Sequence, residues 1–160
     1  MRHGIAIDRE HPDCPEESQR YLTEKGIERT RSAALGLAQL EVKPSALLTS
    51  PYLRAVQTGE IVCEALEIDT KELRSTDALK PNADPARLAG ELSKMAEEEV
   101  ICFGHAPHLD DFVAYAAGAS ATFTSLKKAG AVCLDVESFS PLKAKIAWLL
   151  TSKALRSLGD

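Results

Sequence analysis

The sequence predicts one α/β domain, a three-layer α/β/α sandwich in which helices cover both faces of a mostly parallel sheet. The chain has 160 residues, enough to bury one core of ordinary size. Apolar residues make up 44% of it and charged residues 27%, as in most globular domains. Short apolar runs alternate with amphipathic segments, a pattern typical of the βα units that build parallel sheets.

The first half of the chain contains two predicted helices with a buried strand between them. A helix is expected from about Glu24 to Leu40, with Thr23 as its N-cap. The run Ser45–Thr49 predicts a short buried strand. Ser50 is expected to cap the next helix, which would carry Pro51 at its first position and extend to about Leu66.

The second half continues the alternation. The expected elements are an amphipathic helix at Pro85–Glu98, a strand at Val100–Phe103, a helix from Pro107 to about Gly118, and late strands at Ala131–Val136 and Ala144–Leu150.

Composition narrows the possible functions and locations. The net charge of −5 argues against nucleic-acid binding. No apolar stretch approaches the length of a transmembrane span, so no membrane role is expected. The four cysteines form no CxxC pair, which favours reduced thiols in a cytoplasmic protein.

Three short motifs carry the functional signal: Arg2-His3-Gly4, Ser50–Thr58 and Gly104–Pro107. They resemble the signature segments of the histidine phosphatase superfamily, also called phosphoglycerate mutase-like, in order, in spacing and in chain length. The resemblance implies that residues 1–160 form a single histidine phosphatase domain with the phosphoglycerate mutase-like fold. It also implies that His3 is the nucleophile that takes up phosphate.

The predicted fold brings these motifs to one edge of the sheet. In open α/β sheets, ligands bind beyond the carboxyl ends of the strands, and two strand-to-helix junctions fall at Thr49–Arg54 and Phe103–His108. Arg54 lies in the first turn of its predicted helix, where free N–H groups already favour an anion. We expect a phosphoryl group to meet Arg2, Arg54 and His105 there, because arginine contacts phosphate oxygens bidentately.

The expected mechanism needs neither a metal nor a cofactor. A nucleophilic His3 must be neutral, and the positive charge of Arg2 and Arg54 favours the neutral ring. His105 would stabilise charge on the phosphoryl oxygens in the transition state.

Three further residues are predicted to bind substrate. Gly4 would let the backbone approach the phosphate, and the N–H of Ala106 would lie near a helix start. Arg20 either supports the phosphate site or braces the loop in which it lies.

Two other features leave alternatives open. His105 and His108 are three residues apart, as in a metal-binding pair, but no third ligand follows at a recognisable spacing. His108 is otherwise expected at the pocket rim or exposed. The polar segment Asp8–Glu17 is either a solvated loop or a border of the entrance.

Within the superfamily, the sequence is most similar to the SixA-type phosphohistidine phosphatases. Longer members carry a glutamate that protonates the leaving alkoxide, whereas the corresponding region Asp77–Asp84 has no glutamate. Asp77 or Asp84 could substitute, but an imidazole is less basic than an alkoxide and leaves more readily without an acid. The expected substrate is therefore a phosphohistidine-bearing signalling or phosphotransfer protein.

Two other functions remain open at this stage. They are a phosphatase for a small phosphomonoester, and a non-catalytic module that binds a phosphoprotein. The binding module is considered because only Met1 precedes Arg2. The family's first strand is therefore expected to be truncated, unless translation starts further upstream.

Overall fold

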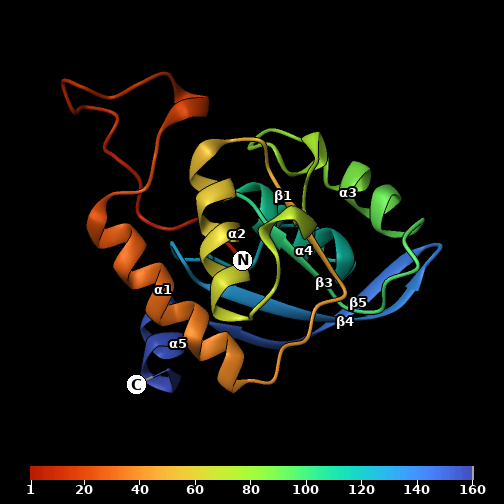
Figure 1. Cartoon of the computed structure of the whole chain (residues 1–160). Coiled ribbons are helices and arrows are strands. Elements are labelled where there is room, and N and C mark those ends of the chain that lie inside the picture. Colours follow the sequence, from red (N-terminus) through yellow and green to blue (C-terminus); the bar gives the residue numbers. More distant parts are fainter. Residues whose placement is uncertain (160) are drawn as a thin grey trace.

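A parallel sheet of three strands lies beside an antiparallel hairpin, and the structure, a computed structural model, describes residues 1–159 (Figure 1). The parallel strands are β1 (Ala46–Thr49), β2 (Leu73–Ser75) and β3 (Val100–Phe103), in the order β2-β1-β3. The hairpin consists of β4 (Ala131–Phe139) and β5 (Leu142–Leu150). The predicted α/β class with a parallel sheet is confirmed.

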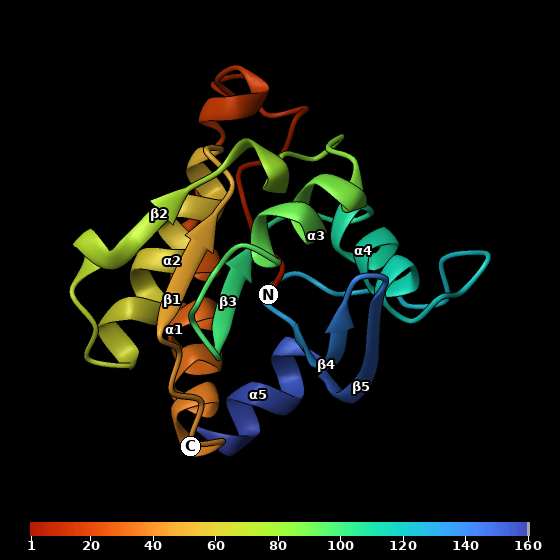
Figure 2. The same ribbon diagram turned by 90° about the vertical axis from the view of Figure 1, so that its right-hand side faces the viewer.

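The N-terminal segment connects the two sheets. The N–H of Gly104 donates to the carbonyl of Met1 at 3.1 Å, and the N–H of His3 donates to the carbonyl of Gly104 at 2.9 Å. On the other side, the N–H of Arg2 donates to the carbonyl of Gly130 at 2.9 Å. Figure 2 shows this end of the chain between β3 and β4. The short first strand is thus a single parallel bridge between Arg2 and Gly104.

Helices cover both faces of the parallel sheet. One face carries α1 (Glu24–Gln39), α2 (Leu53–Ala65) and α5 (Ser152–Leu158), and the other carries α3 (Pro85–Leu92) and α4 (His108–Ala116). Successive side chains of a strand point to opposite faces. Accordingly, Leu47 packs in the core below α1 and α2, while Leu48 packs in the core below α3 and α4. This arrangement confirms the three layers.

Short elements complete the chain. Three 3₁₀ turns occur, η1 (Glu17–Gln19), η2 (Thr70–Glu72) and η3 (Asp77–Leu79). Within residues 1–159, no helix has the length and apolar character needed to cross a bilayer.

The N-terminus of α1 forms as predicted. The hydroxyl of Thr23 accepts a hydrogen bond from the N–H of Gly26 at 3.0 Å, which satisfies one of the first-turn donors. The hydroxyl also donates to the carbonyl of Ile5 at 3.3 Å. The cap therefore fixes the start of the helix to the segment that follows His3.

The predicted start of α2 is wrong by two residues. The helix begins at Leu53, with Tyr52 as its N-cap, and no side chain caps it. The hydroxyl of Ser50 accepts a long hydrogen bond from the N–H of Tyr52 at 3.3 Å. It also lies 2.8 Å from Nε2 of His105, which is the shorter of its two contacts. Ser50 and Pro51 thus form a bend before the helix, and Ser50 contacts a histidine instead of a helix end.

The helix predicted to reach Glu98 ends at Leu92, as α3. Beyond it the chain turns back toward the sheet, and Glu97 forms an ion pair with Arg74 at 2.8 Å. Two elements were not predicted, the edge strand β2 and the C-terminal helix α5.

Candidate active site

Two histidines and an arginine from the three sequence motifs meet at the carboxyl ends of the strands. Nε of Arg54, in the first turn of α2, lies 3.2 Å from Nε2 of His3. The rings of His3 and His105 have centroids 5.2 Å apart and are tilted by 56°. All three side chains are at least 93% buried. The structure thus brings together residues that lie more than a hundred positions apart in the sequence.

The hydrogen bonds of His3 define its tautomer. Nδ1 lies 2.7 Å from the carbonyl oxygen of Gly4. A carbonyl only accepts, so Nδ1 carries the proton and Nε2 keeps its lone pair. That lone pair accepts the hydrogen bond from Arg54. The unprotonated nitrogen of His3 therefore faces the guanidinium group.

Burial keeps both histidines neutral. Desolvation, followed by the charges of Arg54, Arg2 and Lys128, lowers the pKa of His3 to about 3, although the bond to Gly4 opposes this shift. Burial is also the main cause that lowers the pKa of His105, with further contributions from His3 and Arg54. The predicted effect of the arginines has the right sign, but desolvation is the larger cause.

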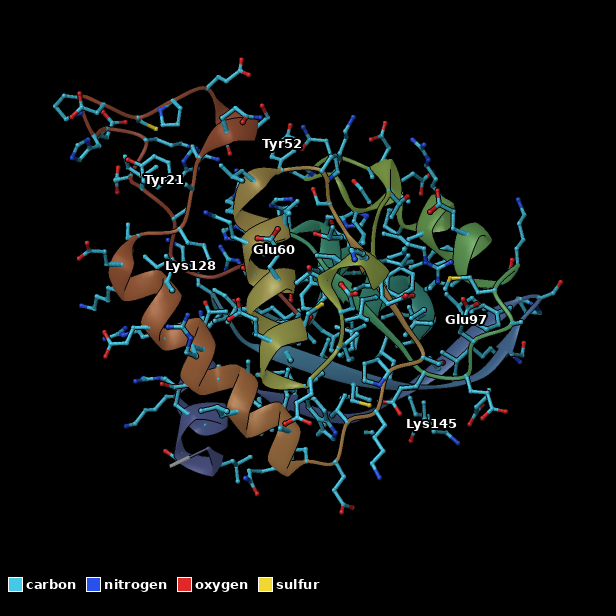
Figure 3. The ribbon with its side chains drawn as sticks, viewed as in Figure 1. Tyr21, Tyr52, Glu60, Glu97, Lys128 and Lys145 are labelled. Atoms are coloured by element: carbon cyan, nitrogen blue, oxygen red, sulfur yellow. The ribbon has the colours of Figure 1, made fainter. Side chains whose placement is uncertain are left out.

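His105 lies against the start of α2. Its Nε2 is 2.8 Å from the hydroxyl of Ser50, and the ring of Tyr52 stands edge-on to it with centroids 5.3 Å apart. Figure 3 shows Tyr52 at the beginning of this helix. Nδ1 of His105 is buried and has no hydrogen-bond partner within residues 1–159.

Glu17 completes the surroundings of Arg54. Nη1 of Arg54 donates to the backbone carbonyl of Glu17 at 2.7 Å, and Nη2 donates to its Oε1 at 2.8 Å. The same carboxylate pairs with Arg9 at 2.9 Å and with Arg20 at 3.2 Å. The hydrogen bond from Arg9 and the charges of Arg54 and Arg20 lower the pKa of Glu17 to about 2. An ionised carboxylate therefore holds three arginines together.

Sequence reasoning gave Glu17 no individual role. It ends the polar segment Asp8–Glu17, and its contact with Arg54 agrees with the interpretation of that segment as a border of the site. The only available signal was its position three residues before Arg20.

Arg2 lies close to the site but contacts a loop. Its Nη1 donates to the carbonyl of Leu126 at 2.7 Å, while its Nε is buried with no partner among the described residues. No hydrogen bond within residues 1–159 links it directly to His3 or Arg54, although its charge lowers the pKa of His3. Contact between Arg2 and a phosphoryl group stays a prediction.

The three predicted substrate-binding residues differ in position. The N–H of Gly4 donates to the hydroxyl of Thr58 at 3.0 Å, and a Cβ at Gly4 would collide with the hydroxyl of Thr30 on α1. The close approach that this glycine permits is thus to a helix. Ala106 follows His105 and is half-buried. The guanidinium of Arg20 donates to the carbonyl of Ile7 at 2.7 Å and to Glu17, so Arg20 braces the loop.

The remaining candidates also have defined positions. His108 is 99% buried, so the prediction of an exposed or rim position is wrong. The side chain of Asp84 caps α3 by accepting from the N–H of Ala86 at 2.9 Å, and Asp77 pairs with Lys80 at 3.0 Å. Residues 1–159 contain no group of three side chains arranged to bind a metal ion.

Comparison with known proteins identifies the class to which this fold and site belong. Residues 1–80 match the sequence profile of the histidine phosphatase superfamily, branch 1. An uncharacterized protein of Picosynechococcus is 36% identical over 138 residues, which cover 84% of this chain and 81% of that protein.

Solved structures share the fold along nearly the whole chain. The protein histidine phosphatase SixA, complexed with tungstate, superposes with a TM-score of 0.84 at 24% identity, covering 97% of this chain and 96% of SixA. A phosphoserine phosphatase of Entamoeba histolytica has a TM-score of 0.73 at 13% identity, covering 96% of each chain. A mycobacterial glucosyl-3-phosphoglycerate phosphatase has a TM-score of 0.71 at 13% identity, covering 94% of this chain and 96% of its own.

The class is therefore that of the phosphatases, hydrolases that remove a phosphoryl group. This chain belongs to the histidine phosphatase superfamily.

Proposed function

We propose that the protein removes the phosphoryl group from a phosphohistidine on a partner protein, with His3 as the nucleophile. The observation that carries this proposal is the neutral Nε2 of His3, held toward Arg54 while Nδ1–H is bound to Gly4. A neutral imidazole with one fixed tautomer is the form that attacks phosphorus. The fold shared with SixA supports the same substrate class.

The reaction would take place in two displacements. Nε2 of His3 attacks phosphorus, the P–N bond of the partner breaks, and its electron pair stays on the leaving imidazole, which takes a proton from solvent water. Water then attacks the phosphoryl group on His3, and inorganic phosphate leaves. Arg54 and His105 would stabilise the charge on the transferring oxygens, and Arg2 would join them if its unpartnered Nε turns to the phosphate.

The acidic residues of the structure support a P–N substrate. The leaving group of a phosphomonoester is an alkoxide, and a general acid that protonates it speeds hydrolysis by about 10²–10⁴. The carboxylate that contacts Arg54 is Glu17, whose pKa of about 2 leaves it without a proton to donate. Asp84 and Asp77 are engaged at a helix cap and in an ion pair. An imidazole leaving group needs no such acid.

The experiment is to trap the phosphoryl group. The protein is incubated with a phosphohistidine protein, and the acid-labile adduct is mapped by mass spectrometry. We expect the adduct on His3, and we expect none in His3→Asn, while His11→Asn, at an exposed histidine, behaves as wild type. An adduct on His105 or His108, or full activity of His3→Asn, contradicts the proposal.

A small phosphomonoester is the second candidate, favoured by the fold shared with the phosphoserine phosphatase of Entamoeba. The two are separated by kcat/KM for a phosphohistidine protein and for a sugar phosphate. We expect the former to be higher, and Asp84→Asn to leave it unchanged. If wild type instead hydrolyses the ester faster, and Asp84→Asn loses that activity, Asp84 is a general acid.

Location and binding partners follow from the same proposal. The four cysteines are free thiols, which agrees with a cytoplasmic site of action. A non-catalytic phosphoprotein-binding module would bind the partner without releasing phosphate. Release of inorganic phosphate at a rate that depends on His3 would exclude that alternative.

A further inference from the structure

A cavity of about 610 Å³ beside the N-terminal segment is lined by six basic side chains and no acidic one. It lies where the start of α1, the loop before β4 and the start of α5 meet. In Figure 3, Lys128 is labelled close to the N-terminal part of α1. The basic residues are Arg2, Arg29, Lys127, Lys128, Lys153 and Arg156.

The basic side chains of this cavity lack ion-pair partners within residues 1–159, although Glu24 and Glu28 line the neighbouring pocket with Arg29 and Arg156. None of the six forms an ion pair with another of the described residues, whereas Arg9, Arg20 and Arg54 all pair with Glu17. Nε of Arg156 is buried and has no hydrogen-bond partner within residues 1–159. Like charges repel one another and opposite charges attract, so an anion that entered this cavity would be attracted to it.

The cavity adjoins the catalytic site. Arg2, which lines it, immediately precedes His3. The N–H of Ala129, another lining residue, donates to the carbonyls of Arg2 at 3.2 Å and His3 at 3.1 Å. The charge of Lys128 contributes to the lowered pKa of His3. The cavity therefore lies one residue along the chain from His3, although His3, Arg54 and His105 do not line it.

We propose that this cavity is a second anion-binding site, which holds carboxylate side chains that lie near the phosphohistidine on the partner protein. Three half-buried arginines offer planar forks that match carboxylates, and the exposed lysines Lys127, Lys128 and Lys153 form the open rim. An exposed rim suits a protein surface. The inference rests on the proposed function, because it assigns the carboxylates to the same substrate.

Binding is tested without catalysis. A fluorescent hexaglutamate peptide is titrated against wild type, against Lys127→Glu/Lys153→Glu, and against the control Lys94→Glu/Lys143→Glu. Both double variants change the net charge equally, but Lys94 and Lys143 are exposed lysines outside the cavity. We expect the cavity variant to bind the peptide about tenfold more weakly, or weaker still, than wild type does. The control variant should bind it with nearly the wild-type affinity. Equal weakening in both variants overturns the site.

Kinetics identify the source of the anion. For a phosphohistidine protein we expect the cavity variant to raise KM about tenfold at unchanged kcat, while hydrolysis of phosphoramidate, which cannot reach the cavity, stays as in wild type. Tripolyphosphate and unlabelled glutamate peptides are compared as competitors of the fluorescent peptide. If tripolyphosphate displaces it at a far lower concentration, the assignment to carboxylates is overturned. Peptide binding that depends on the rim lysines, without any hydrolysis of phosphohistidine, would refute the proposed function but leave the anion site standing.

Discussion

Glu17 is the residue on which the position of Arg54 depends. Its carbonyl and its carboxylate accept from two nitrogens of the guanidinium, so that the third nitrogen faces His3. Hydrogen bonds to charged groups contribute roughly 1.5–3 kcal/mol each. Loss of the carboxylate would let the guanidinium move away from His3, the proposed nucleophile.

We therefore expect Glu17→Ala to lower kcat by about ten- to a hundredfold, with a smaller change in KM. Glu17→Gln, whose side-chain oxygen still accepts a hydrogen bond from Arg54, should retain most of the wild-type kcat. Arg9→Ala is the matched control, because Arg9 contacts the same carboxylate but is 69% exposed. Steady-state kinetics check this, and an equal loss in the glutamine and alanine variants would argue against the positioning role.

The neutral state of His3 makes stability depend on pH. Its pKa is about 3 in the folded protein and 6.5 in the unfolded chain, so between these values the unfolded state binds a proton that the folded state does not. The free energy of unfolding therefore rises with pH through this range and falls on acidification. Between pH 7 and pH 5, His3 should account for a loss of about 2 kcal/mol.

Urea unfolding of wild type and His3→Asn at the two pH values measures this contribution. The wild type should lose about 2 kcal/mol more than the variant on going to pH 5. Identical losses would mean that His3 is protonated in the folded protein at pH 5, and thus unable to act as a neutral nucleophile there.

At the scale of single residues, sequence motifs could predict which groups of the candidate site lie together but not which residues hold them there. His3, Arg54 and His105 lie in short motifs that can be recognised in the sequence without knowledge of the fold. The contacts of Glu17 and Ser50 depend on how a loop and a bend lie against those patterns. Such contacts between distant segments leave no periodic or positional signal in the sequence.

At the scale of the elements, Gly26 determines how closely α1 approaches the segment after His3. A Cβ at Gly26 would collide with the carbonyl oxygen of Ile5, a backbone atom that cannot swing aside. At Gly90, within α3, a Cβ would meet nothing within 4 Å. The two glycines are thus a matched pair for testing close packing against helix propensity.

Gly26→Ala should destabilise the protein by about 3 kcal/mol and reduce activity, because the backbone that leads from His3 must shift. Gly90→Ala should stabilise it by about 0.5–1 kcal/mol, since alanine favours the helix and nothing opposes the methyl group. Thermal unfolding of both variants checks the pair. A similar change in both would show that α1 can move away from Ile5 at little cost.

The elements themselves were predictable where a cap or a long apolar pattern specified them. Thr23 located the start of α1, and the apolar run located β1. The start of α2 was misplaced because Ser50 and Pro51 also suit a helix N-terminus, and only the contact with His105 shows that they lie before it. β2 has three residues, none of them fully buried, so no alternation could reveal it.

At the scale of the whole molecule, the positive charge that acts on His3 comes from the side chains of Arg54, Arg2 and Lys128. Arg54, His105 and the nearby Arg2 surround His3, and no described cluster of side chains suits a metal ion. Activity should therefore survive exhaustive dialysis against EDTA at the wild-type rate. Loss of turnover that one divalent metal restores would contradict the mechanism and revive the His105/His108 pair as ligands.

The place of His3 also has a consequence for how the protein is made. Met1 binds Cys102 across 101 positions, and Arg2 binds Gly130. Such non-local contacts form late, because a long stretch of chain must first be closed into a loop. On a ribosome, roughly ten seconds of synthesis separate the first residues from the partners that hold them in place. His3 is thus synthesised well before the residues that hold it in place, so we expect no phosphatase activity from a nascent or truncated chain until β3 and the start of β4 have been added.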